Sequence, residues 1–366
     1  MIINPNFYKT VKIAQTAPKS DFNYTITTIS GVDYAVINYI DFTNNPNTAI
    51  RIPERIEDSG ISYPVAFRYN MFTNANTNLG NCNELTIDYK PYIYKNTSST
   101  EHFRYPNQIK YLNLYNLEFY SLGGYTNIYY EMPSFLEELN LSVTILTKIP
   151  ERLFYNNQSV NIDEIVSNLV GANTITEIEA YAFTNCINLT YGTWNTVDTI
   201  GEYAFSGCSA LQTISFPIVT SIGNSAFYGC SNLVNVSLPA VVSLTSKNTF
   251  DSCVALHELK LENVVTLGNN EGTGTIMFRN CTNLETIDLY ETTSLIGYNS
   301  SNKLFNNCNN IKHIYLRASS KCSLNVANCL CPTTSLVAIH IPSALLASYQ
   351  ADSNWSAYSS YFVGDL

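Results

Sequence analysis

The sequence predicts a β-rich solenoid, a right-handed coil that lays short strands side by side on one face. Three observations lead to this fold: a recurrent Phe-x-x-Cys motif, a strand pattern that opens each unit, and insertions confined to one phase of the repeat. Successive motif cysteines lie 22, 22, 23, 28 and 27 residues apart, a spacing typical of repeat proteins. The motifs are Phe183/Cys186, Phe205/Cys208, Phe227/Cys230, Phe250/Cys253, Phe278/Cys281 and Phe305/Cys308.

The clearest unit runs from Leu211 to Cys230. Its opening strand alternates apolar and polar residues, so the third and fifth residues after Leu211 are expected to point into the coil. A second apolar anchor, Ile222, is followed by Gly223, which we interpret as a tight turn with positive φ. The other expected anchors and turn glycines are Ile200, Leu244, Leu267, Ile296, Gly201, Gly268 and Gly297.

Residues 1–51 and 52–174 precede the regular units and depart from their pattern. Residues 1–51 are predicted to form an N-terminal β cap or attachment segment, because Tyr34–Ile40 shows strand-like alternation. Residues 52–174 are interpreted as irregular repeats with Tyr- and Asn-rich loops, including a loop excursion at 88–108. Strand patterns recur there at 82–87, 109–114 and 136–141, and Asn157 takes the cysteine position after Phe154.

Residues 175–342 are predicted to hold the regular repeats, and residues 343–366 a C-terminal cap. Insertions at 269–275 and 298–303 share one phase, so we expect them to lie close together as loops on one edge. The segment after Pro342 indicates a short helix, and Leu345, Leu346, Trp355 and Tyr358 are the expected cover for the last apolar face.

Six of the ten cysteines share one repeat position. A small apolar residue is wanted at such a position, so these thiols are expected to be buried, stacked and reduced rather than joined in disulfides. Cys322, Cys329 and Cys331 form a further cluster near the end of the repeats. We interpret it as packing of the last coil in preference to a metal site.

Composition and charge argue against several classes of function. The net charge of −10 and the lack of Lys or Arg runs exclude a typical nucleic-acid partner. No apolar stretch approaches the 18 residues or so needed to span a membrane. The chain also starts without a secretory signal, which favours a virion or cytoplasmic location over classical secretion.

No residue pattern indicates catalysis, a cofactor or a bound metal. Nucleophile, phosphate-binding and dinucleotide motifs are missing from the sequence. Cys253 and Cys308 lie near His257 and His313 in sequence. However, the cysteines belong to the inward ladder and the histidines to outward positions, so their side chains do not converge on a metal ion.

The repeats resemble the BspA-type leucine-rich repeat family. The likeness is close in residues 200–208 and 222–230, where Ile-Gly-x-x-Ala-Phe-x-x-Cys recurs. Residues 52–65 look like the lead-in that often precedes such arrays, and Ser343–Tyr361 looks like a common terminal cap with Tyr349 and Trp355 at its key places. The resemblance implies recognition or adhesion at surfaces by proteins of bacteria, some protists and their viruses, and it implies no catalytic residues.

The outward face of the strands is the predicted recognition surface. Its fourth position changes along the array from small hydroxyls to charged and aromatic side chains, a mixture suited to protein or glycan contact. The candidate binding residues are Lys260, Asp288, Tyr315, His340, Glu258 and His313. A second candidate is the Tyr-rich surface of Tyr111, Tyr115, Tyr120, Tyr125, Tyr129 and Tyr130.

The predicted function is non-enzymatic recognition of a host-surface protein or glycan. Two alternatives remain open: a structural component of a phage particle that contacts neighbouring virion proteins, and a cytosolic protein-interaction scaffold. Both fit a solenoid, which offers a long surface in place of a closed pocket.

Overall fold

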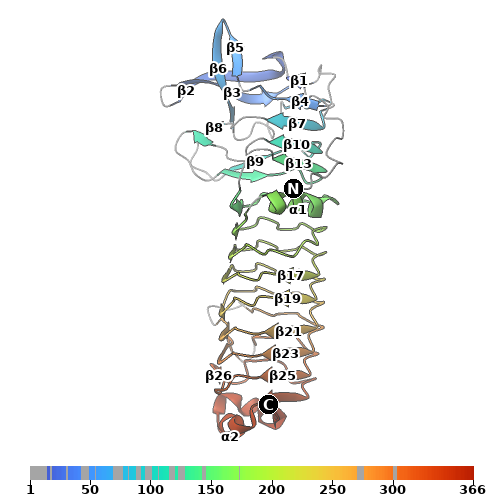
Figure 1. Ribbon diagram of the computed structural model, residues 1–366, viewed down its shortest axis with the longest axis vertical. Helices are drawn as coiled ribbons and strands as arrows, with labels where there is room; N and C mark the ends of the chain where they lie inside the picture. The colour runs from blue at the N-terminus through green and yellow to red at the C-terminus, as the bar shows by residue number, and fades with distance from the viewer. Residues whose placement is uncertain are drawn as a thin grey trace. The chain divides into compact units, whose positions relative to one another are not determined.

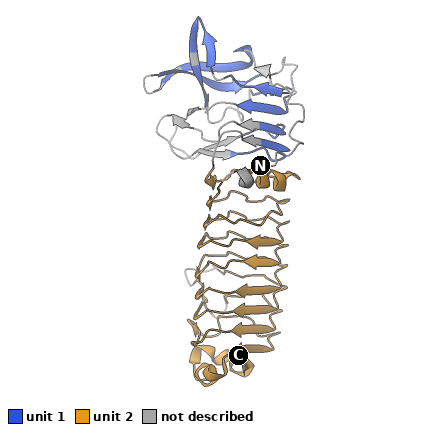
Figure 2. Cartoon of the chain, viewed as in Figure 1, with its two compact units in different colours: residues 1–145 blue, residues 146–366 orange. Residues whose placement is uncertain are grey.

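The computed structural model contains two compact units, residues 1–145 and 146–366 (Figure 2), and each is described here by itself. The described residues are 15–16, 19–29, 32–42, 49–53, 55–68, 77–80, 82–87, 92–94, 101–105, 107–114, 120–122, 128–141, 146–172, 174–269, 276–299 and 303–366. Predicted domain boundaries at 51, 174 and 342 stay predictions.

In the first unit, one sheet is a parallel ladder. Its order is β1 (Gln15–Thr16), β4 (Ala49–Arg51), β7 (Glu84–Ile87), β10 (Tyr111–Leu114) and β13 (Glu138–Leu141). Leu85, Leu112 and Leu139 occupy one register position. The upstream strand patterns predicted from sequence are therefore confirmed.

A second sheet of this unit has the order β11 (Tyr120–Leu122), β8 (Tyr92–Tyr94), β6 (Ile61–Arg68), β3 (Val32–Ile40) and β2 (Phe22–Ile29). β5 (Arg55–Asp58) pairs antiparallel with β6, and β2 pairs antiparallel with β3. A short 3-10 turn, η2 (Lys19–Asp21), leads into β2.

The loop excursion predicted at 88–108 is wrong for its described part, which contains β8 and β9 (Glu101–Arg104). β9 pairs with β12 (Ile128–Glu131) in a separate two-stranded sheet. Tyr92-Ile93-Tyr94 carries the aromatic and branched side chains that favour strands. The sequence prediction relied on the polar composition of residues 88–108 as a whole and so overlooked these three strand-forming residues.

The second unit is a parallel β-solenoid whose coils stack one upon the next (Figure 1). One side carries β14 (Lys148–Ile149), β15 (Glu177–Ile178), β16 (Thr199–Ile200), β18 (Ser221–Ile222), β20 (Ser243–Leu244), β22 (Thr266–Gly268), β24 (Ser294–Ile296) and β26 (Ser323–Leu324). The opening strands of the repeats are β17 (Thr213–Ser215), β19 (Asn235–Ser237), β21 (Glu258–Leu261), β23 (Thr286–Leu289), β25 (His313–Leu316) and β27 (Ala338–Ile341), followed by β28 (Phe362–Gly364). The predicted solenoid is confirmed.

The motif phenylalanines form a continuous stack through the interior of the second unit. Neighbouring ring centroids lie 5.0–5.4 Å apart from Phe154 to Phe305, and all seven rings are fully buried. Phe154 and the buried Asn157 fill the Phe and Cys positions of the first coil, as the sequence predicted. Each ring between Phe154 and Phe305 therefore packs on the rings of both adjacent coils.

The motif cysteines are free and buried, and each donates its S–H to a backbone carbonyl in the preceding coil. Cys208 Sγ lies 3.1 Å from the Phe183 carbonyl oxygen, which also accepts the backbone N–H of Cys186. The equivalent thiol bonds of the ladder are 2.9–3.3 Å long. Burial raises the pKa of the Cys230 thiol to about 12. The predicted burial and stacking of this ladder are thus confirmed.

Gly268 has the positive φ predicted from sequence (φ 106°), whereas Gly201, Gly223 and Gly297 do not. They are needed for close approach instead, because a Cβ on Gly223 would lie 2.4 Å from the Glu202 backbone nitrogen. Positive φ occurs at other recurrent positions, notably directly before the motif cysteine, as at Asn185 (φ 59°) and Gly207 (φ 74°). Asn and Gly tolerate that conformation best.

One predicted anchor is displaced by a residue. Leu295, and not Ile296, pairs in register with Leu267 and Leu324 and is fully buried. Ile296 is half-buried and lies opposite Gly268. The sequence prediction chose Ile296 because it stands directly before Gly297, as Leu267 stands directly before Gly268. The two glycines are not equivalent in the ladder, because Gly268 lies opposite Ile296.

Sequence reasoning also missed α1 (Ile162–Ala172), within residues interpreted as irregular repeats. Ile162, Ile165, Val166 and Leu169 are buried and follow helical spacing. The negative charges of Asp163 and Glu164 in the first turn interact favourably with the positive end of the helix dipole. The periodicity needed to find this helix is present in the sequence.

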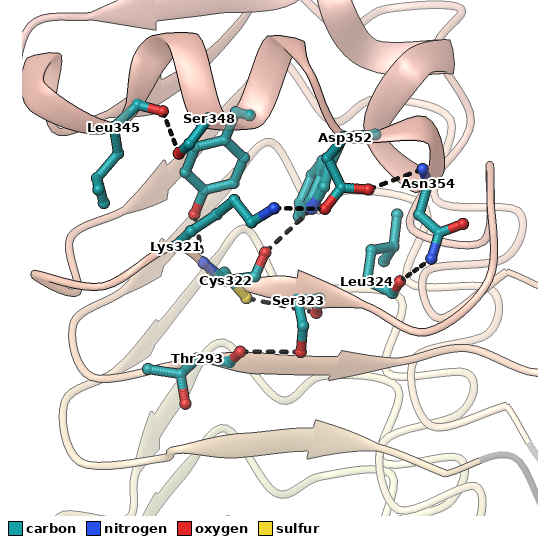
Figure 3. A network of polar contacts seen from close by, with 11 residues as sticks. Thr293, Lys321, Cys322, Ser323, Leu324, Leu345, Ser348, Asp352 and Asn354 are labelled. Carbon is teal, nitrogen blue, oxygen red and sulfur yellow. Dashed lines mark hydrogen bonds and ion pairs between the residues drawn. The ribbon is translucent and has the colours of Figure 1, made fainter.

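The last coil is followed by η4 (Ser343–Leu345), α2 (Leu346–Gln350) and η5 (Ser353–Tyr361). Trp355 Nε1 donates to the Cys322 carbonyl at 3.0 Å, and the Tyr349 hydroxyl accepts the Cys322 N–H at 2.7 Å. Lys321 and Asp352 form an ion pair beside them (Figure 3). Trp355 and Tyr358 are fully buried, whereas Leu345 and Leu346 are half-buried.

Candidate recognition surface

The strand register brings the predicted binding residues into two adjacent rows. Lys260, Asp288, Tyr315 and His340 lie directly opposite one another on β21, β23, β25 and β27. The neighbouring row contains Glu258, Thr286, His313 and Ala338. The alignment that the sequence predicted for these residues is therefore correct. Whether they bind a ligand stays a prediction.

A third row, which sequence reasoning missed, continues the outward face by one more step. The N–H of Tyr290 donates to the Leu261 carbonyl at 3.1 Å, and that of Arg317 donates to the Leu289 carbonyl at 2.8 Å. Each residue lies two positions beyond the predicted row. Because side chains alternate faces along a strand, counting two residues further would have identified both.

Asp288 is not an exposed carboxylate, although its backbone lies in the outward row. It is only 8% exposed, because the Arg317 side chain lies across it. Arg317 donates from Nε at 2.5 Å and from Nη2 at 3.1 Å, a bidentate arrangement. This hydrogen bonding raises the pKa of Arg317. The Asp288 side chain thus positions Arg317.

Planar and cationic groups follow one another along the strands as one assembly. Lys260 Nζ lies 5.2 Å from the centre of the Tyr290 ring, and the Arg317 guanidinium lies 5.1 Å from the same ring centre. Arg317 is also 4.9 Å from the Tyr315 ring centre, and Tyr315 stacks on His340 at 4.3 Å. We call Lys260, Tyr290, Arg317, Tyr315 and His340 the aromatic–ionic stack.

Two carboxylates accompany the cations and the imidazole of this stack. Lys260 pairs with Glu262 at 3.1 Å, and this hydrogen bond is the main reason that the Lys260 pKa is raised. His340 Nδ1 lies 2.9 Å from the Asp365 carboxylate, beyond β28. His313 Nδ1 lies 3.1 Å from His340 Nε2. Asp365 was missed because β28 was not expected to extend the sheet.

The other candidates of the sequence analysis are only partly described. Tyr111 donates its hydroxyl to Glu137 at 2.7 Å. The side chains of Tyr115, Tyr120, Tyr125, Tyr129 and Tyr130, and most of the two insertions, lie outside the described residues. Cys322, Cys329 and Cys331 are buried.

In the part of the chain that the structure describes, no helix is long and apolar enough to cross a membrane. Among the same residues, no group of three or more His, Cys, Asp or Glu is placed to hold a metal ion.

Comparison with known proteins identifies the repeats. The profile of the BspA type leucine rich repeat region matches in six copies over residues 176–273 and 269–351. Residues 176–351 are a BspA-type leucine-rich repeat region. The BspA-type repeats therefore carry every member of the aromatic–ionic stack, whereas Asp365 lies beyond them. The curated proteins compared with the chain include no match.

Solved structures similar to the chain include bacterial leucine-rich repeat proteins. One from Bacteroides ovatus is 17% identical, with a TM-score of 0.43, and the match covers 88% of this chain and 82% of that one. The pneumococcal vaccine antigen PcpA is 12% identical, with a TM-score of 0.41 and coverage of 94% and 96%. A T. pallidum leucine-rich repeat protein is 20% identical, with a TM-score of 0.34 and coverage of 52% and 79%.

Proposed function

We propose that this chain is a non-enzymatic recognition protein that binds a protein partner on the aromatic–ionic stack. The observation that carries the proposal is the close packing of two tyrosines and an arginine: the Arg317 guanidinium lies 5.1 Å from the Tyr290 ring centre and 4.9 Å from the Tyr315 ring centre. Tyrosine and arginine are among the residues that contribute most binding energy at protein interfaces. Glu258 and His313 lie in the adjacent row and extend the proposed contact area.

The stack is held in place before any partner arrives. Asp288 fixes Arg317 by two hydrogen bonds, while Arg317 and His340 both pack on the Tyr315 ring. The strands beneath are joined by continuous parallel pairing. Immobilising flexible side chains is a large cost of association, and a surface fixed in advance avoids part of it.

The packing of the rings favours a protein partner over a glycan. A sugar that binds an aromatic residue commonly lies flat on a free ring face. His340 stacks on the Tyr315 ring with centroids 4.3 Å apart, and the Arg317 guanidinium lies over the same ring at 4.9 Å, so less of the ring face is free for a sugar. The ring edge and hydroxyl of a tyrosine suit the mixed polar and apolar contacts of a protein interface.

The proposal is tested with a Tyr290→Ala, Tyr315→Ala double variant. The matched control is Tyr181→Ala, Tyr203→Ala, which removes a second stacked tyrosine pair, 5.1 Å apart, from the same unit. Parent and variants are applied to an array of extracellular proteins and to a glycan array, after circular dichroism and melting confirm the fold.

We expect protein ligands of the parent to bind the Tyr290/Tyr315 variant at least tenfold more weakly and the control variant normally. Undiminished protein binding by the Tyr290/Tyr315 variant would refute the proposal. Binding that appears only on the glycan array, or that is lost only when residues 1–51 are deleted, would also overturn it. The last result would favour the assembly component considered above.

A further inference from the structure

Two histidines that are far apart in the sequence meet on the strand face. His313 and His340 are 27 residues apart, yet His313 Nδ1 lies 3.1 Å from His340 Nε2. Both side chains are half-buried. Sequence reasoning compared His313 only with the nearby Cys308 and so missed this pair.

The hydrogen bonds fix which nitrogen of each neutral ring carries the proton. His340 Nδ1 faces the Asp365 carboxylate at 2.9 Å, so this nitrogen is the donor. His340 Nε2 then has a free electron pair, and it accepts from His313 Nδ1. Asp365 therefore orients an unprotonated imidazole nitrogen toward the second ring, the arrangement found where a carboxylate supports a metal-binding histidine.

The spacing of the two ring nitrogens is close to that of two ligands on one metal ion. Nitrogens bound to one zinc ion at about 2.0–2.1 Å lie about 2.9 Å apart at a right angle and about 3.3 Å apart at the tetrahedral angle. The 3.1 Å separation falls between these values. The ring centroids are 5.4 Å apart, so the two nitrogens meet head to head in the metal-free hydrogen bond. To share a tetrahedral zinc ion, each ring has to turn by about 35°, so that both lone pairs point at the ion.

We propose that His313 and His340 chelate a divalent transition-metal ion of the zinc, copper and nickel class. The ligands are His313 Nδ1 and His340 Nε2, and Asp365 is the positioning residue that orients His340. Binding moves the His313 proton from Nδ1 to Nε2 through solvent, so the ring stays neutral and no proton is lost overall. Imidazole is a preferred ligand of all three metals.

The remaining coordination positions of the ion are open. No third His, Cys, Asp or Glu of the described residues joins the pair as a ligand. Water completes the coordination in the isolated chain. Metal binding is independent of the proposed protein partner, so it is tested without one and can fail or succeed separately.

The test is isothermal calorimetry of the full chain with Zn²⁺, together with electron paramagnetic resonance after addition of Cu²⁺. We expect one ion per folded chain and a copper spectrum with two coordinated nitrogens. His313→Ala and His340→Ala should each weaken Zn²⁺ binding at least tenfold. Asp365→Asn should weaken it about tenfold while the two-nitrogen spectrum persists.

His257→Ala is the matched control, since His257 is an exposed histidine on the edge of the same sheet, and it should bind Zn²⁺ like the parent. Conservative His313→Gln and His340→Gln variants serve if either alanine variant melts early. Zn²⁺ should raise the melting temperature of the parent and not of these variants. Unchanged binding by the His313 variants, or a copper spectrum with sulfur ligands from the buried cysteines, would refute the site.

Discussion

At the scale of single residues, the motif cysteine serves both packing and hydrogen bonding. The Phe205 carbonyl accepts the Cys208 N–H at 3.1 Å and the Cys230 S–H at 3.2 Å, so its two lone pairs are both used. Alanine would fill much of the same space without the second bond. Serine would supply that bond but would bury a more polar group. The recurrence of cysteine follows from these two requirements together.

The buried thiols predict a loss of stability at alkaline pH. Burial raises the pKa of Cys230 to about 12, whereas an unfolded cysteine has a pKa of about 8.5. The stabilisation is therefore fully present below about pH 8.5 and is lost as the pH rises toward 12. We expect the melting temperature of the parent to fall through this range.

Cys230→Ala provides the comparison for this pH effect. At pH 7 its melting temperature should be lower than that of the parent. The difference in melting temperature should narrow as the pH rises, because the parent loses the stabilisation from the Cys230 thiol and alanine has no proton to lose. Thermal melts from pH 7 to 11 measure both curves. A difference that stays constant across this range would contradict the prediction. In addition, thiol titration should show few reactive groups in the folded parent and ten after denaturation.

Gly223→Ala should be strongly destabilising for a reason that φ does not reveal. Its Cβ would lie 2.4 Å from the Glu202 backbone nitrogen, and backbone in the adjacent coil has little freedom to move away. We expect a loss of about 3 kcal/mol or more in the free energy of unfolding. The control is Gly229→Ala, where φ is +71° and the nearest atoms are 3.9 Å away.

The Gly229→Ala variant should lose only about 1–2 kcal/mol, the cost of a left-handed backbone. Urea denaturation of both proteins measures the difference. Equal losses would show that the close approach of two coils does not explain the glycine at position 223.

At the scale of elements, the phenylalanine stack couples each coil to the next. Phe227 lies 5.4 Å from both Phe205 and Phe250. Phe227→Ala should therefore destabilise the protein by about 3–5 kcal/mol. Tyr228→Ala removes an exposed ring from the next position and should change stability by no more than about 0.5 kcal/mol. Chemical denaturation of the two variants measures both losses in the free energy of unfolding. Similar losses would show that Phe227 is wrongly assigned to the interior position of its coil.

The elements that sequence predicted well are those that repeat. The strands at 85–87, 112–114 and 139–141 and the coils after residue 175 recur often enough for alternation and spacing to fix their register. Elements that occur once, such as α1 and β28, have no second copy for comparison. Leu295 shows the limit within the repeats: it lies six residues after Leu289, as Leu267 does after Leu261, but the next glycine is two residues away and not one.

The sequence predicted which candidate residues lie side by side on neighbouring strands, but not which side chains contact one another. The register placed Lys260, Asp288, Tyr315 and His340 together, since each takes the same position in its unit. Which of them would be covered depended on the long Arg317 side chain crossing to Asp288. Likewise, the approach of Asp365 to His340 depends on a strand from outside the repeats. Periodicity carries no information about such single contacts.

At the scale of the second unit, we expect stability to depend on the segment that covers the last coil. Trp355 is fully buried, packs against Tyr349 with centroids 5.3 Å apart, and bonds to the Cys322 carbonyl. A repeat array transmits a loss at its end to its neighbours first. Trp355→Ala should therefore reduce hydrogen-exchange protection most in β25 and β27 and progressively less toward β17.

Hydrogen exchange followed by mass spectrometry resolves that gradient. Ser356→Ala is the control, because Ser356 is exposed on the same 3-10 helix and should leave protection unchanged. A uniform loss across residues 146–366 would indicate one cooperative body without a directional response.

Parallel coil-to-coil pairing has a mechanical consequence for residues 146–366. Hydrogen bonds such as those of β23 to β25 link one coil to the next along the stacking direction. Tension applied to the two ends of this unit loads these bonds a few at a time, as in a zipper, and not all together in shear. A 22-residue coil such as the one from Cys208 to Cys230 releases about 75 Å of chain when it opens. Stretched by an optical trap, the unit should lengthen in a series of such steps at low force, and would therefore act as an extensible tether that absorbs a sudden load.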